Sequence, residues 1–257
     1  MKIKHSKLLT KTVLIDLVTI FFIMFLFLTL GNSVKDKTLD ATQGKTIEQI
    51  KIDLVSSTKE AEQLTKNIKG LVFILIGGLI LATLLTIAAM TYSRMYIWDK
   101  LINHNFKKKY AFKWLAILIL TAVILFVAGL GAILLRLILN LVVSFTSDYA
   151  IDIYVRITNM LFFVAFMFLY FIILNTFSKT KKVFESIGKS FENIKQNFKT
   201  HAKKYLRILI FSIVLSLITH YVMRLVIYQS QWIITLTSSI FLLTLVGVTR
   251  IYLTKYK

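Results

Sequence analysis

The chain of 257 residues contains no cysteine and no proline, and only 17% of its residues are charged. Without cysteine the protein has no disulfide framework, no cysteine-ligated zinc and no thiol nucleophile. Without proline it lacks the residue that most strongly interrupts a helix. Soluble domains have about 25% charged residues, so the low charge content excludes a soluble globule and a disordered chain.

Apolar residues make up 57% of the sequence, and the mean hydropathy is +0.73. They gather in six runs, and a helix of roughly 20 apolar residues crosses the hydrocarbon core of a bilayer. We therefore predict an all-α, polytopic integral membrane bundle that forms one membrane domain over residues 1–257. The six transmembrane helices are predicted at about residues 13–31, 70–92, 113–136, 157–178, 206–226 and 231–250, with an outer loop at residues 32–69.

Basic residues are distributed unequally between the two sides of the predicted membrane. One side carries 22 basic and three acidic residues, and the other carries ten and eight. Loops rich in Lys and Arg stay in the cytoplasm, so we predict a multi-pass protein of the cell membrane whose N-terminus and C-terminus are both cytoplasmic. The net charge of +20 then indicates attraction to anionic membrane lipids of the cytoplasmic leaflet, and no nucleic-acid partner is expected.

The first predicted span has the basic flank of a secretory signal peptide. Its apolar run of 18 residues, from Val13 to Leu30, is longer than the about 7–15 residues usual for a signal peptide, and it contains Asp16. We expect this span to be retained in the membrane, and cleavage after it is the alternative.

Two predicted cytoplasmic segments, residues 92–110 and 179–204, repeat apolar side chains at steps of three or four, with lysines between them. This pattern predicts two basic amphipathic helices that lie among the lipid headgroups. Both segments contain Asn-Phe-Lys and lead to an aromatic-Leu pair that opens a span. A duplicated span–helix–span unit is one interpretation, and chance or shared interfacial chemistry is the other. The lysines predicted to contact lipid are Lys107, Lys108, Lys109, Lys199, Lys203 and Lys204.

The outer loop at 32–69 has charges of alternating sign, and its apolar residues from Ile47 to Ile68 follow a helical spacing. This pattern predicts a helical extension of the second span, in the form of a helical hairpin. A lid that captures a ligand is the alternative.

The segment SFENIKQNFKTHAKKYLRILI runs from a cytoplasmic amphipathic helix into a span. Together with its surroundings, residues of about 176–249, it resembles the membrane domain of some glycerophosphoryl diester phosphodiesterases and related six-helix membrane families. The resemblance covers less than a third of the chain, and the soluble catalytic domain of that family is absent from it. It therefore implies an accessory or scaffold membrane module rather than phosphodiesterase activity.

Asp16 is the only acid inside a predicted span. A charge within the membrane is costly and is usually paired. Arg94 and Arg250 end their spans at a similar depth, so we predict a structural ion pair between Asp16 and one of these two arginines.

Other candidates for chemistry are few. The histidines show no metal-ligand spacing and no His-Glu-x-x-His motif, and the carboxylates of Asp148 and Asp152 are interpreted as a solvated pair. We predict no catalytic residue, no metal and no cofactor. The polar residues that we single out within or beside the spans are Asp16, His220, Arg224 and Arg136.

Two functions are compatible with this pattern. The first is a non-enzymatic integral membrane module, either an accessory or scaffold protein with a protein partner or a lipid-interacting subunit. The alternative is a small-solute or ion-coupled membrane transporter, which the polar residues inside the spans favour. A transporter should direct these residues into one cavity, whereas a scaffold should bury them in pairwise contacts.

Overall fold

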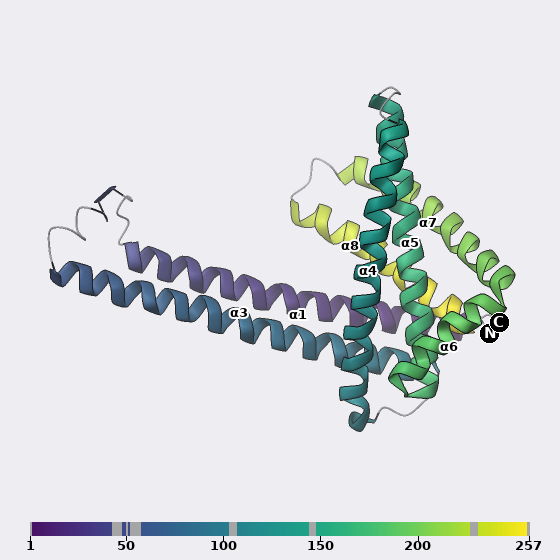
Figure 1. Ribbon diagram of the computed structural model, residues 1–257, viewed down its shortest axis with the longest axis horizontal. Coiled ribbons are helices and arrows are strands. Elements are labelled where there is room, and N and C mark those ends of the chain that lie inside the picture. Colours follow the sequence, from purple (N-terminus) through teal and green to yellow (C-terminus); the bar gives the residue numbers. More distant parts are fainter. Residues whose placement is uncertain are drawn as a thin grey trace. The chain divides into compact units, whose positions relative to one another are not determined.

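The computed structural model describes residues 2–42, 48–49, 51, 58–102, 107–143, 148–226 and 231–255. Within these ranges the elements are all helices, coloured along the chain in Figure 1. They are α1 (Lys2–Thr42), α3 (Thr58–Leu101), the 3-10 helix η1 (Lys108–Tyr110), α4 (Ala111–Val143), α5 (Asp148–Thr180), α6 (Val183–Gln196), α7 (Phe198–Val226) and α8 (Gln231–Lys255).

Six of these helices are long and apolar enough to cross a membrane. The predicted all-helical fold with six such helices is therefore confirmed, and its insertion into a membrane stays a prediction. Only α6 among the α-helices of the described chain is too short and too polar for this role. The six segments are Lys7–Leu39, Leu64–Leu101, Lys108–Ile138, Tyr154–Thr180, Phe198–Leu225 and Ile233–Thr254.

The chain divides into two compact units, residues 17–92 and residues 1–16 with 93–257. The first unit consists mainly of the long parts of α1 and α3. A Cβ atom at Gly78 would clash with Cδ1 of Leu30, so the two helices approach closely at this glycine. Helix α1 ends at Thr42 and α3 begins at Thr58. Both therefore continue as helices into the predicted outer loop, as the hairpin interpretation requires, and residues 43–47 lie outside the described residues.

The core of the second unit forms around α5, which packs against α4, α6, α7 and α8. Bulky side chains of α5 meet two fully buried tryptophans there. The ring of Phe177 meets Trp114 edge-on at 4.9 Å between centroids, and Phe171 lies 6.1 Å from Trp98. Aromatic pairs of this geometry add to the stability gained from burial of the rings.

The two segments predicted to be basic amphipathic helices have different structures. Helix α3 continues through the first segment without a break as far as Leu101. Of the apolar stripe predicted there, Met95 and Trp98 are fully buried and Tyr92 is 46% exposed. The two buried side chains pack in the core instead of facing lipid headgroups, and residues 103–106 lie outside the described residues. The second segment forms the separate helix α6, in which Phe184 is 81% exposed. Figure 1 shows α6 as a short helix after the end of α5.

Candidate functional site

Asp16 accepts hydrogen bonds from two arginines of the same compact unit. Nη1 of Arg94, in α3, donates to Oδ1 of Asp16, and Nη2 of Arg250, in α8, donates to Oδ2 over 3.0 Å. We predicted that one of these arginines would pair with Asp16, and the structure shows both. The carboxylate therefore joins α1, α3 and α8 through charge-assisted hydrogen bonds, which are the strongest kind in proteins.

This three-residue cluster is buried. Asp16 is 1% exposed and Arg250 is fully buried, with its guanidinium carbon 5.4 Å from the centroid of the Phe171 ring. Two arginines and one carboxylate leave an excess of one positive charge. Removal of one member of a buried pair is strongly destabilising, because it leaves the remaining charge buried without compensation. The cluster therefore holds α1, α3 and α8 together.

Gly247 brings α8 close to α1 one turn before Arg250. A Cβ atom at this position would lie 2.8 Å from Cδ1 of Leu9 and 3.0 Å from Cγ2 of Val13. A larger residue would require the side chains of Leu9 and Val13 to shift. This contact was not predicted from the sequence, because a single glycine in a span does not indicate which helix packs against it.

A second buried ion pair joins the end of α3 to the junction of α5 and α6. Nζ of Lys181 lies 2.6 Å from Oδ1 of Asp99, and Asp99 is 2% exposed. The ammonium also lies 5.2 Å from the ring centroid of Trp114 and 5.7 Å from that of Tyr110. Lys181 has a φ of 54°, a conformation that a non-glycine residue adopts only at a cost. These contacts hold Lys181 in that conformation.

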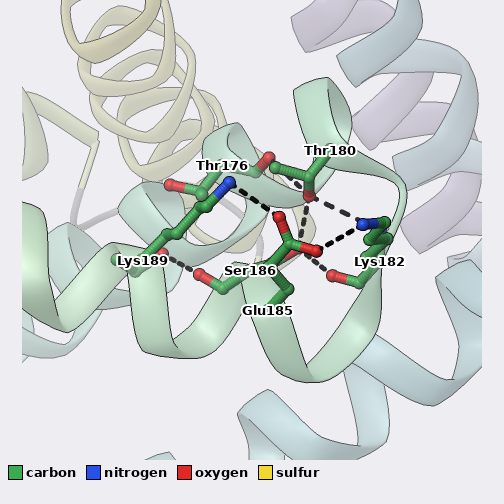
Figure 2. Close-up of polar contacts among 7 residues, drawn as sticks. Thr176, Thr180, Lys182, Glu185, Ser186 and Lys189 are labelled. Atoms are coloured by element: carbon green, nitrogen blue, oxygen red, sulfur yellow. Dashed lines mark hydrogen bonds and ion pairs between the residues drawn. The ribbon is translucent and has the colours of Figure 1, made fainter.

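The same junction contains exposed ion pairs of Glu185 and, beside them, a buried hydroxyl of Ser186 (Figure 2). The carboxylate of Glu185 lies 2.8 Å from Nζ of Lys182 and 2.6 Å from Nζ of Lys189. Hydrogen bonds from Lys182 and Lys189 lower the pKa of Glu185 to about 2. The hydroxyls of Thr180 and Ser186 are 2.6 Å apart, so α6 is tied to the end of α5 by side chains as well as by backbone.

The other polar candidates do not join the Asp16 cluster. Arg136 donates from Nη1 to Oδ1 of Asn159 over 2.9 Å, and Arg224 is exposed near the end of α7. His220 lines a separate groove of about 400 Å³ between α7 and α8, together with hydroxyls that include Ser216 and Thr219. The side chains of Asp148 and Asp152 lie outside the described residues.

The six lysines predicted to contact lipid lie in the second unit. Lys107, Lys108, Lys109, Lys199 and Lys203 are exposed, and Lys204 is half-buried. All six belong to loops or helix ends that the sequence analysis placed on the cytoplasmic side. Their exposure leaves them available to an anionic surface.

Three further lysines come together in a way that was not predicted from the sequence. Lys7 and Lys11 of α1 and Lys100 of α3 line a groove of about 600 Å³. The spacing of Lys7 and Lys11, one helical turn apart, is the signal that marks them as neighbours on one face. Nothing in the sequence placed Lys100 opposite them.

Among the residues that the structure describes, no group of three or more His, Asp or Glu side chains is placed to hold a metal ion. Comparisons of the chain with protein-family models, curated proteins and solved structures gave no match.

Proposed function

We propose that this protein is a non-enzymatic membrane module whose cytoplasmic side binds anionic lipids and serves as a scaffold or an accessory surface for a protein partner. In this proposal the six long helices span the cell membrane with both termini in the cytoplasm. The resemblance of residues 176–249 to the membrane domains of some glycerophosphoryl diester phosphodiesterases supports an accessory role and carries no catalytic role.

The observation that carries this proposal is the pairing of the polar residues in the spans. Asp16 is bound by two arginines, and Arg136 is bonded to Asn159. A substrate-coupling carboxylate needs access to water or to a solute, whereas Asp16 is 1% exposed. Burial of Asp16 between two arginines is what a structural bundle requires, and the Arg136–Asn159 bond pairs a second polar residue at an exposed position.

The first experiment is extraction of the tagged protein in mild detergent, followed by mass spectrometry of the lipids and proteins that co-purify. We expect anionic phospholipid to be enriched relative to the bulk membrane, together with a stoichiometric protein partner if the module is an accessory subunit. The variant K107Q/K108Q/K109Q should carry less anionic lipid, because three exposed charges are removed. A lipid content equal to that of the bulk membrane would contradict the lipid-binding role.

A transporter is the second candidate, and the groove between α7 and α8 is the observation that favours it. This groove combines His220 with several hydroxyl groups in helices long enough to span a membrane. Vesicles loaded with a pH-sensitive dye test the simplest form of this candidate. Proton flux above that of empty vesicles, lost in His220→Ala and retained in Asn159→Ala, would favour the transporter over the scaffold.

Single cysteines test the proposed orientation, because the chain has none of its own. Ser33 and Lys195 are both exposed. Ser33→Cys should react with an impermeant maleimide in intact cells, and Lys195→Cys should react only after the cells are opened. The opposite result would reverse the orientation and move the lysine-rich face outside.

A further inference from the structure

The groove between the start of α1 and the end of α3 belongs to one compact unit of the chain. Its volume of about 600 Å³ lies within the size range of pockets that hold small ligands. In the sequence, Lys11 lies two residues before the apolar run that begins at Val13, and Lys100 lies six residues after Arg94, which follows the second run. The groove therefore lies at the level where the predicted cytoplasmic headgroups meet the acyl chains.

The charges around this groove are all positive. Lys7, Lys11 and Lys100 line it, and no carboxylate is among its lining residues. The two acids nearest to them in sequence are occupied elsewhere, since Asp16 binds two arginines and Asp99 binds Lys181. Three ammonium groups around one hollow repel each other unless an anion lies between them.

The remaining lining of the groove is mostly apolar. Leu8, Leu14 and Ile15 of α1 line it, together with Tyr96 of α3. A free inorganic anion would use the lysines and leave this apolar wall uncovered. A molecule with an anionic head and a hydrocarbon chain would satisfy both parts, because lysine stems and apolar side chains favour the chain while the ammonium groups favour the head.

We propose that this groove is a specific site for one anionic glycerophospholipid of the cytoplasmic leaflet. The headgroup phosphate lies among Lys7, Lys11 and Lys100, and an acyl chain lies along Leu8, Leu14 and Ile15. This inference rests on the proposed lipid-binding function and assigns it a defined place, distinct from the exposed lysines at 107–109.

The test uses the full chain in nanodiscs of phosphatidylglycerol and phosphatidylcholine, released for native mass spectrometry. The variant K7Q/K11Q/K100Q removes the three groove charges, and the control K35Q/K66Q/K69Q removes the same number of exposed charges in the predicted outer loop. We expect the groove variant to retain about tenfold less phosphatidylglycerol than the wild type, because each basic residue near an anionic lipid adds to the affinity for that lipid. The control variant should keep the single tightly bound lipid.

A second variant tests the apolar wall without a change of charge. Leu14 lines the groove and is 58% exposed, so Leu14→Trp adds bulk there with little effect on the core. It should also displace the bound lipid, and a thermal melt in detergent would verify that each variant is folded.

The outcomes separate the two proposals. Lipid loss as large in K107Q/K108Q/K109Q as in the groove variant would show a diffuse basic surface and overturn the specific site, while the proposed lipid-binding function would stand. Equal loss in K35Q/K66Q/K69Q would show an effect of net charge alone and overturn both. No preference of the wild type for phosphatidylglycerol over phosphatidylcholine would overturn both. Binding of soluble glycerol phosphate with the same affinity as the lipid would show that the apolar wall is not used, and would also overturn the proposed occupant.

Discussion

Helix α6 and the last two turns of α3 both repeat apolar residues at helical spacing, but they bury different side chains. At the end of α3 the apolar stripe is inside the core, and Trp98 is fully buried. In α6 the fully buried residues are Ser186 and Ser190, and Phe184 and Phe191 are exposed. Hydrophobic periodicity thus identified an apolar face in each segment without indicating whether protein or lipid would cover it.

The contacts of each segment explain the difference. The end of α3 meets the aromatic side chains of α5, where Phe171 supplies a partner for Trp98. Helix α6 is held to α5 through the hydroxyls of Thr180 and Ser186, so its phenylalanines point elsewhere. The same difference applies to the ion pairs, since Asp99–Lys181 is buried and the pairs of Glu185 are exposed to solvent.

The largest expected effect is the loss of Trp98. Trp98→Ala should lower the free energy of unfolding by about 3–5 kcal/mol, because a large buried ring is lost and a cavity remains. Phe184→Ala is the matched control on α6, and it should change the free energy of unfolding by no more than about 0.5 kcal/mol. Unfolding titrations in mixed micelles measure both. A similar loss of unfolding free energy in Trp98→Ala and Phe184→Ala would contradict the different burial of the two segments.

The buried ion pair at the end of α3 should have the next largest effect. Asp99→Asn leaves Lys181 without a carboxylate, in a strained backbone conformation that the ion pair holds. We expect a loss of about 1.5–3 kcal/mol, the range for a hydrogen bond to a charged group. Glu185→Gln removes the exposed counterpart on α6 and should cost clearly less in the same titration. A larger loss for Glu185→Gln than for Asp99→Asn would contradict this order.

The exposed phenylalanines of α6 should affect contact with lipid rather than stability. Phe184→Trp places an indole where the amphipathic helix is expected to meet the headgroups, and lipids brominated near the headgroup should quench its emission. Glu192→Trp, on the polar face, is the control and should be quenched much less. The native tryptophans are subtracted by comparison with the wild type. Equal quenching at both positions would show that α6 does not lie along the membrane.

The smallest effect should be the pH dependence of the exposed pairs on α6. Because the pKa of Glu185 is lowered to about 2 in the folded protein, the ion pairs stabilise α6 above the unfolded pKa of about 4.3. That contribution is lost as the pH falls through about 2. Carboxyl carbon NMR should show Glu185 still ionised at pH 4, and Glu185→Gln should abolish the signal. Titration of Glu185 near pH 4 would indicate that the pairs are not formed in solution.

Some polar contacts of the candidate site were predictable from the sequence and others were not. The depth of Asp16 in its span, compared with Arg94 and Arg250, predicted an ion pair, because depth follows from the number of residues between a charge and the end of a span. The sequence analysis expected one partner, and the structure has two. The groove with Lys7, Lys11 and Lys100 was missed, because Lys100 comes to it from a helix 89 positions further along the chain than Lys11.

The sequence by itself determined the class of the fold: long apolar runs without proline form helices, and their number and approximate bounds follow from local composition. It also determined that the basic residues are concentrated on one side of the predicted membrane. Only the tertiary structure decided which apolar stripe is covered by protein, which arginines share Asp16, and which lysines face one another. The physical reason is that helix formation and hydropathy depend on neighbours within a few turns, whereas contacts between helices depend on the rotation of each helix about its axis and on its partners, which one sequence does not reveal.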